Sequence, residues 1–260
     1  MDKLKRRIYV FKQYFSLLRE LVSRDIKLKY RRSVLGILWT VLNPLLMMLV
    51  QVFVFSNLFQ RVENYPLYLM TGTLFFSFNS EATRTSLQAI TGNFNLINKI
   101  YVPKYLFVLS KVATALVNMV FSLAALVLLL IITKSHFYFT MLLLPFPILY
   151  LLLFSTGLSL LLGCLNVFFR DLEHLYSIFI LAWTYLTPLF YPIEIIPERY
   201  RAILYYNPMN IYITYFRDLF INGVMPSFQS NIVCFAIGII TLIAGILVFY
   251  KKQNDFYLYM

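Results

Sequence analysis

The sequence predicts an all-α integral membrane protein. We expect six transmembrane helices, an N-terminal amphipathic helix at the membrane interface, and re-entrant helices between spans five and six. Composition is the first observation behind this fold class, because 60% of the 260 residues are hydrophobic, only 13% are charged, and the mean hydropathy is +0.74. Such values lie well outside those of ordinary soluble domains. The second observation is that uncharged apolar stretches recur along the chain, with basic residues gathered beside them.

The first 33 residues form a basic amphipathic segment. Eleven of the first 32 residues are Lys or Arg. Apolar residues recur among them at helical spacing, namely Phe11, Tyr14, Phe15, Leu18, Leu21 and Val22. A helix with such a face is typical of the membrane interface, although a solvated basic anchor explains the same pattern. We therefore expect a cytosolic interface helix over residues 1–33 and one membrane domain over residues 34–260.

Six apolar segments follow, at 34–59, 64–83, 105–133, 140–169, 175–193 and 229–250. Each is long enough for a helix to cross a hydrocarbon core of about 30 Å. The stretch 202–216 is shorter and contains Asn207-Pro208, so the region 194–225 is expected to be re-entrant or interfacial. With this arrangement, 18 of the 23 Lys and Arg residues fall on one side, which places both termini in the cytosol.

Several kinds of chemistry lack their residues in this sequence. There is no phosphate-binding loop, no nucleophile elbow and no zinc-binding helix motif, so we expect no catalysis and no cofactor in this chain. The two cysteines, Cys164 and Cys234, lie in apolar segments and are expected to be small core residues. The net charge of +12 is concentrated beside the spans, where anionic lipid headgroups explain it better than nucleic acid does.

Ionisable side chains also occur at the expected ends of spans. Glu81 lies near Arg84 in the sequence, and Arg170 lies near Asp171 and Glu173. Charges within a membrane are often functional, as in proton relays. Because these residues lie at span ends, we expect structural pairing within each group instead.

Four motifs occur in a specific order along the chain. They are RDIKLKYRRSVLGILW over residues 24–39 followed by Asn43-Pro44, NVFFRD over 166–171, TPLFY over 187–191, and YNP over 206–208 with FRD over 216–218. In this order they resemble the entry to the first span, the turn between spans four and five, the broken end of the fifth span and the re-entrant segment of polysaccharide-exporting ABC transporter permeases. The resemblance covers nearly the whole chain.

The resemblance implies a permease subunit in the bacterial cytoplasmic membrane that dimerises with a second copy of itself. It also implies two separate ATPase subunits, which would hold the ATP and Mg, and a lipid-linked substrate such as an O-antigen, capsule or teichoic-acid polymer. An ABC exporter of another amphiphile, a lipid or a drug, is the nearest alternative. A membrane-embedded transferase is a further alternative, but it would need a polar catalytic pair that we do not find in the sequence.

Aromatic residues are dense around the outer end of the fifth predicted span. Their rings offer an apolar face to a sugar, and tyrosine adds a hydroxyl group. An ordinary interfacial belt would also be rich in Trp and Tyr, and the resemblance favours a glycan conduit. The residues predicted for this conduit are Trp183, Tyr185, Phe190, Tyr191, Tyr205 and Tyr206.

On the cytosolic side, residues 94–101 predict a short helix with an apolar face, preceded by the capping residue Asn93 and followed by Pro103. An apolar face on a cytosolic loop needs a partner or the bilayer surface to cover it. The resemblance favours a coupling helix docked on the ATPase over an interfacial helix. The residues predicted for coupling are Phe94, Leu96, Ile97, Lys99, Ile100 and Tyr101, together with Arg170 and Asp171.

Overall fold

The computed structural model describes residues 2–31, 33–55, 64–97, 99 and 102–259, and every regular element in these ranges is helical. The α-helices are α1 (Asp2–Tyr30), α2 (Trp39–Phe55), α3 (Tyr65–Leu87), α4 (Phe94–Ile97), α5 (Tyr105–Ile132), α6 (Pro145–Phe168), α7 (Leu172–Leu186), α8 (Glu198–Tyr205), α9 (Pro208–Arg217), α10 (Phe228–Lys252) and α11 (Phe256–Tyr259). Short 3-10 helices lie at Gly36–Leu38, Thr91–Asn93, Phe139–Leu143 and Ile193–Ile195, and a π-helical turn at Asp218–Asn222 follows α9. The helical fold class is therefore confirmed.

Within the described residues, three helices have the length and composition of a membrane span. They are α5, the helical stretch Phe139–Phe168 that contains α6, and α10. The fourth apolar helix, α2, has 17 residues and contains Pro44, so it is shorter than the predicted segment 34–59, whose residues 56–59 lie outside the described ranges. The helix α7 has 15 residues and ends before the proline-rich stretch that the predicted segment 175–193 included.

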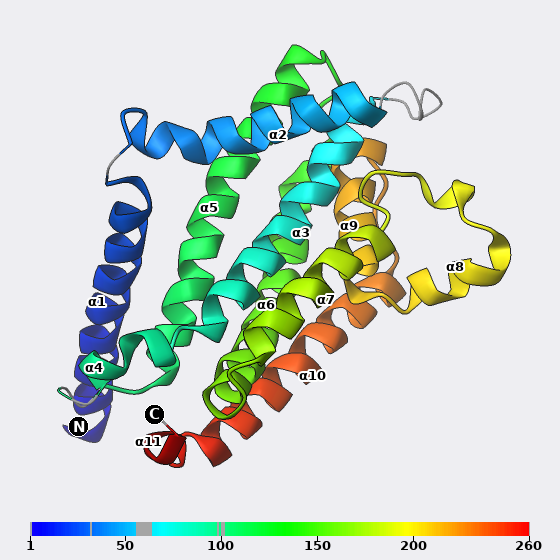
Figure 1. The fold of residues 1–260 in the computed structure, drawn as a ribbon. Coiled ribbons are helices and arrows are strands. Elements are labelled where there is room, and N and C mark those ends of the chain that lie inside the picture. The colour runs from blue at the N-terminus through cyan, green and yellow to red at the C-terminus, as the bar shows by residue number, and fades with distance from the viewer. Residues whose placement is uncertain (1, 32, 56–63, 98, 100–101, 260) are drawn as a thin grey trace.

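The long helices form one bundle with α3 at its centre (Figure 1). α3 packs against α5, α6, α9, α2 and α7, and large side chains such as Phe75 and Leu69 are fully buried on it. α6 and α10 make the most extensive helix pair. They approach closely because Gly157 and Gly245 face each other, and a Cβ on either residue would collide with backbone atoms of the other helix.

The connections gather at two ends of the bundle (Figure 1). The start of α1, α4, the turn between α6 and α7, and α11 lie at one end, while the Phe139–Leu143 turn lies at the other. The sequence assigns the first group to the cytosolic side and the second to the outer side. The structure places these two groups of connections at different ends of the bundle.

The N-terminal segment forms a 29-residue helix, as predicted. Its apolar face is only in part available to lipid, because Leu21 is 4% exposed in a cluster with Ile97 and Phe107, whereas Phe15 is 59% exposed. α1 packs along α5. α1 is thus attached to the bundle by protein contacts, while Phe15 stays exposed.

The proline-containing breaks occur where the sequence predicts them. α7 ends at Leu186, directly before Thr187-Pro188, because proline disfavours helix in the residue before it and cannot supply its own backbone N–H. α8 and α9 are separated at Asn207, whose side chain accepts a hydrogen bond from the Met209 amide at 3.1 Å. Both cysteines are buried and unpaired, as expected.

Candidate functional site

A cavity of about 1060 Å³ runs along one face of α3. Its walls come from the end of α1, from α2, α3 and α5, and from residues 184–190. The α3 residues that line it extend from Met70 to Thr85, which corresponds to a length of about 22 Å along the helix. We call this cavity the α3 groove.

Hydroxyl and amide groups dominate the polar lining of the α3 groove. Among them, Thr73, Thr85, Ser122 and Thr184 donate their hydroxyl hydrogen to a carbonyl of their own helix. The side chains of Asn43, Gln51, Ser77 and Ser80 make no hydrogen bond within the described part of the chain. These four groups are therefore free to donate to a polar molecule in the groove.

The end of the α3 groove nearest α1 carries charge. Glu81 accepts hydrogen bonds from Lys29 Nζ at 2.9 Å and from Asn118 Nδ2 at 2.8 Å. The expected pairing of Glu81 with Arg84 is therefore wrong, because α1 supplies a lysine from outside the local sequence. Arg84 also lines the groove, and its guanidinium makes no hydrogen bond or ion pair with any residue that the structure describes.

The opposite end of the α3 groove is formed by the broken segment after α7. Phe190 lines the groove and stacks on Phe55 at a ring distance of 5.6 Å. The Tyr65 hydroxyl donates to the Phe190 carbonyl at 2.7 Å, and the Tyr68 hydroxyl donates to the Tyr191 carbonyl at 3.0 Å. Two tyrosines of α3 thus fix the irregular backbone at this end.

Arg217 strengthens the same junction from α9. Its side chain is 7% exposed, donates to the carbonyls of Pro188 at 3.1 Å and Tyr68 at 3.0 Å, and lies 3.5 Å from the Tyr68 ring centre. Gly72 leaves the space for it, because a Cβ there would lie 2.6 Å from Arg217 Nη2. The guanidinium therefore binds backbone carbonyls at the helix break, which keeps that segment against α3.

Of the six residues predicted for the conduit, only Phe190 lines the α3 groove. Trp183 packs inward on Phe76 and donates its indole N–H to Asn207 at 2.9 Å. The other four belong to the surface around the helix break: Tyr185, Tyr205 and Tyr206 are 62%, 65% and 86% exposed, and the Tyr191 hydroxyl donates to the Tyr185 carbonyl. The structure does not bring these six residues together in one wall.

The density of aromatic residues in the sequence did not point to the polar residues that line the α3 groove. Thr73, Ser77, Ser80 and Arg84 recur at spacings of three and four residues, which places them on one face of α3. This polar stripe inside an otherwise apolar predicted span is the signal that points to the groove.

A second cavity, of about 410 Å³, lies at the end of the bundle that holds α4. Phe94 lines it from α4, and Arg170 and Glu173 line it from the turn between α6 and α7 and the start of α7. Gln88 Nε2 donates to Glu173 at 2.6 Å across this cavity wall. The structure thus brings together Phe94 and Arg170, which were both predicted for coupling, and it gives Glu173 a partner other than Arg170.

The orientation expected for Ile97 is wrong. Ile97 is 5% exposed and packs with Leu21, Phe107 and other residues of its own chain, so it does not present an apolar face to a partner. Leu96 packs partly against the same cluster, while Lys99, Arg170 and Asp171 are exposed. The helix itself ends at Ile97, and the predicted coupling residues Ile100 and Tyr101 lie outside the described residues.

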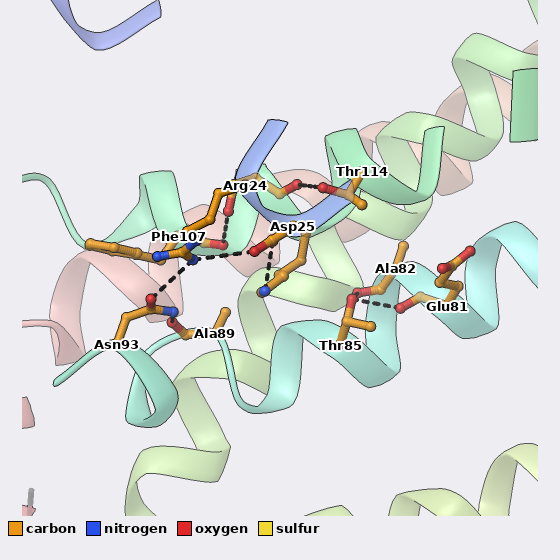
Figure 2. A network of polar contacts seen from close by, with 11 residues as sticks. Arg24, Asp25, Glu81, Ala82, Thr85, Ala89, Asn93, Phe107 and Thr114 are labelled. Atoms are coloured by element: carbon orange, nitrogen blue, oxygen red, sulfur yellow. Dashed lines mark hydrogen bonds and ion pairs between the residues drawn. The ribbon is translucent and has the colours of Figure 1, made fainter. Parts of the chain in front are cut away.

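Charged side chains at the end of α1 connect this helix to both regions, and Asp25 lies among them. Figure 2 shows it between Arg24 and the side chains of neighbouring helices. Asp25 accepts from Lys111 Nζ of α5 at 2.7 Å and from Arg24 Nη2 at 3.2 Å, and Arg24 also donates to Asn93 Oδ1 at 3.2 Å. Asn93 directly precedes Phe94, the first residue of α4. Lys29, which is also on α1, binds Glu81 in the α3 groove. α1 therefore contacts the segment before α4 and the α3 groove at once.

A bundle with apolar helices long enough to span a membrane, and with a long polar groove beside its central helix, defines a helical membrane protein. The chain belongs to the ABC-2 type transporter family, whose model matches residues 16–221.

Named relatives align over most of their length. The O-antigen export system permease protein RfbA of Klebsiella pneumoniae is 31% identical over 93% of this chain and 94% of its own length. The protein of the same name from Myxococcus xanthus is 32% identical over 98% of both chains. The polysialic acid transport protein KpsM of Escherichia coli is 24% identical over 81% of this chain and 82% of its own length.

Proposed function

We propose that this chain is the membrane permease of an ABC exporter that moves a lipid-linked polysaccharide across the bacterial cytoplasmic membrane. The observation that carries the proposal is the near full-length similarity to relatives named for O-antigen export. An O-antigen, a capsule polymer or a teichoic acid would be the cargo. ATP would be hydrolysed by a separate subunit, because the sequence has no phosphate-binding loop.

The chemistry of the α3 groove supports a glycan as cargo. Sugar hydroxyls need both donors and acceptors, and the free donors of Ser77, Asn43 and Gln51 line the groove together with hydroxyl oxygens that can only accept. Phe190 adds an aromatic surface at the far end. A groove of this kind holds a sugar chain through many weak contacts, so that the chain can still slide.

We further propose six spans with both termini in the cytosol, in a complex of two copies of this chain and two ATPase subunits. The spans would be α2, α3, α5, α6, α7 and α10, and the region 194–225 would be re-entrant. The grouping of α4, the α6–α7 turn and α11 at one end supports this topology (Figure 1). Closed two-fold symmetry would then place the grooves of two protomers around one axis.

The second cavity supports a coupling role for its surroundings. It lies between the segment before α4 and the α6–α7 turn, so a side chain of the ATPase inserted there would contact two loops at once. Phe94 and Arg170 would be the principal contacts. Ile97 would act from within, by holding α4 on the bundle.

The proposal is tested by deleting the gene in its host and measuring surface polysaccharide by gel electrophoresis of cell-surface extracts. We expect the polymer to disappear from the surface and to return with the wild-type gene. A Ser77→Leu variant, which places an apolar side chain in the groove, should insert normally but restore little polymer. A Ser177→Leu variant on the exposed surface of α7 serves as the matched control.

The result that would overturn the proposal is an unchanged level of surface polymer in the deletion strain. A simultaneous change in an exported lipid or drug would then favour the alternative exporter. Co-purification of the tagged chain should recover an ATPase in equal number, and its absence under mild detergent would contradict the proposed assembly.

A further inference from the structure

We infer that Arg217 is the positioning residue that closes the α3 groove at the end formed by the segment after α7, and that withdrawal of its guanidinium opens this end. The inference rests on the proposed function, whose topology places this end on the outer side, and adds to it the side chain on which closure depends. We call residues 187–191 the break segment.

The break segment is held in place by side chains. Leu189 and Phe190 line the α3 groove at this end, and residues 187–191 form no helix. The carbonyls of residues 188–191 each accept a hydrogen bond from a side chain of α3 or α9. Irregular backbone at membrane depth is tolerated only where its polar groups are satisfied in this way. The closed end therefore depends on the donors that α3 and α9 supply.

Arg217 is the donor that joins three pieces of the chain at this end. Its guanidinium donates to the carbonyls of Pro188 at 3.1 Å and Leu189 at 3.4 Å in the break segment. It also donates to the Tyr68 carbonyl of α3 at 3.0 Å and lies 3.5 Å from the centre of the Tyr68 ring. One side chain of α9 thus holds the break segment and α3 together.

The closed arrangement leaves the Arg217 charge without a counter-charge. The side chain is 7% exposed, and it forms no ion pair with an acidic residue in the part of the chain that the structure describes. Its Nε is buried without a hydrogen-bond partner among the same residues. Asp218, the next residue, accepts instead from Asn222 at 3.0 Å. A buried cation held only by carbonyls and a ring would regain hydration on leaving, which suits a contact that breaks and re-forms.

α9 itself is fixed to the bundle by other contacts. The Tyr212 hydroxyl donates to the Cys234 carbonyl of α10 at 3.0 Å. The Phe216 ring lies 4.3 Å from the Phe75 ring of α3. Neither contact involves the break segment. Withdrawal of the Arg217 guanidinium would therefore free the break segment from this donor while α9 stays in place.

The experiment measures how fast a thiol in the groove reacts with a sulfonated, membrane-impermeant maleimide. The full chain carries Ser77→Cys, because Ser77 lines the α3 groove with an exposed side chain. The native residues Cys164 and Cys234 are buried, so the background is low. The reagent is added to right-side-out membrane vesicles without ATP, so that it reaches the groove only from the outer side.

Closure should depend on the guanidinium. We expect the thiol to react at least about tenfold faster in Arg217→Gln, because hydrogen bonds from a charged donor are lost from the closed state. Arg217→Lys should give an intermediate rate, since the charge remains without the planar fork. Gly72→Ala should also raise the rate, because its Cβ would lie 2.6 Å from Arg217 Nη2 and displace it. Arg199→Gln, which removes an exposed arginine of α8, is the matched control and should react like the parent.

A control without Ser77→Cys separates opening from unfolding. Arg217→Gln alone should stay unlabelled, because Cys164 and Cys234 are buried. Labelling of either native cysteine would mean that this variant unfolds, and Gly72→Ala, which keeps the arginine, then decides the question. Inside-out vesicles report the other face, and an increase seen only there would overturn the inference.

Two further results would also overturn it. One is rapid labelling of Ser77→Cys with Arg217 intact, which would mean that the end is not closed. The other is an unchanged rate in both Arg217→Gln and Gly72→Ala. Labelling requires neither substrate nor ATPase, so these results leave the exporter proposal intact, whereas surface polymer that persists without the gene refutes the exporter.

Discussion

Replacing Asp25 with Asn tests whether the ion pair with Lys111 attaches α1 to the bundle. The Asp25 side chain is 10% exposed, and Lys111 Nζ lies 2.7 Å from it. Lys111 itself is 22% exposed, so water reaches it in part. The substitution keeps the size of the side chain but removes its charge. It therefore isolates the electrostatic part of the contact.

The expected cost follows from this burial. Losing a hydrogen bond to a charged group costs about 1.5–3 kcal/mol, and breaking a fully buried pair costs about 3–5 kcal/mol. Because Lys111 is partly hydrated, we expect a value near the lower range, about 2 kcal/mol for Asp25→Asn. In a double-mutant cycle with Lys111→Met, the coupling energy should be about 1–2 kcal/mol.

The assay is thermal unfolding of the purified full chain in detergent, for the wild type, both single variants and the double variant. About 2 kcal/mol corresponds to a fall in Tm of about 4–8 °C for a chain of this size. The matched control is Asp255→Asn, because Asp255 and Lys252 form a 3.9 Å pair whose side chains are 45% and 57% exposed. Such a surface pair should change Tm very little.

Two results would refute this reasoning. A coupling energy below about 0.5 kcal/mol would mean that Asp25 and Lys111 do not depend on each other. An equal loss of stability in Asp255→Asn would mean that the measured effect is not due to burial. In the complex with its ATPase, Asp25→Asn should also reduce substrate-coupled ATP turnover, because Arg24 would hold Asn93 less firmly before Phe94.

Three further predictions concern packing, coupling and topology. Ile97→Asp should lower the free energy of unfolding of the isolated chain by more than about 2 kcal/mol, because it places a carboxylate in a buried cluster. Phe94→Asp should mainly weaken ATPase pull-down, because Phe94 lines the second cavity. The reverse pattern would contradict the orientation of α4. Gly245→Ala should lower the free energy of unfolding by about 1–3 kcal/mol, because its Cβ would push α10 away from α6. Gly92→Ala is the control and should be nearly neutral, because a Cβ there meets no atom within 4 Å. Equal melting temperatures of the two variants would argue against the glycine contact. A reporter fused at the C-terminus should give a cytosolic signal and one after Arg201 an outer signal, and any other combination would exclude the six-span topology.

The sequence alone determined the helical membrane class and the positions of the helix breaks. These features follow from local properties, because the length of an apolar run sets whether a helix can span and proline interrupts a helix regardless of its surroundings. The end of α7 at Leu186 and the division of α8 from α9 at Asn207 both follow from such local rules. The order of the motifs also indicated the family, which the comparisons then showed.

Only the tertiary structure decided which side chains face one another. Glu81 pairs with Lys29, 52 residues away, instead of with Arg84 on its own helix, because the packing of α1 brings that lysine to the groove. Ile97 faces inward because it belongs to a buried apolar cluster that includes residues of α1, α5, α6 and α10. The rotation of a helix about its axis depends on all the helices around it, so the lining of the α3 groove could not be read from the sequence of α3 alone.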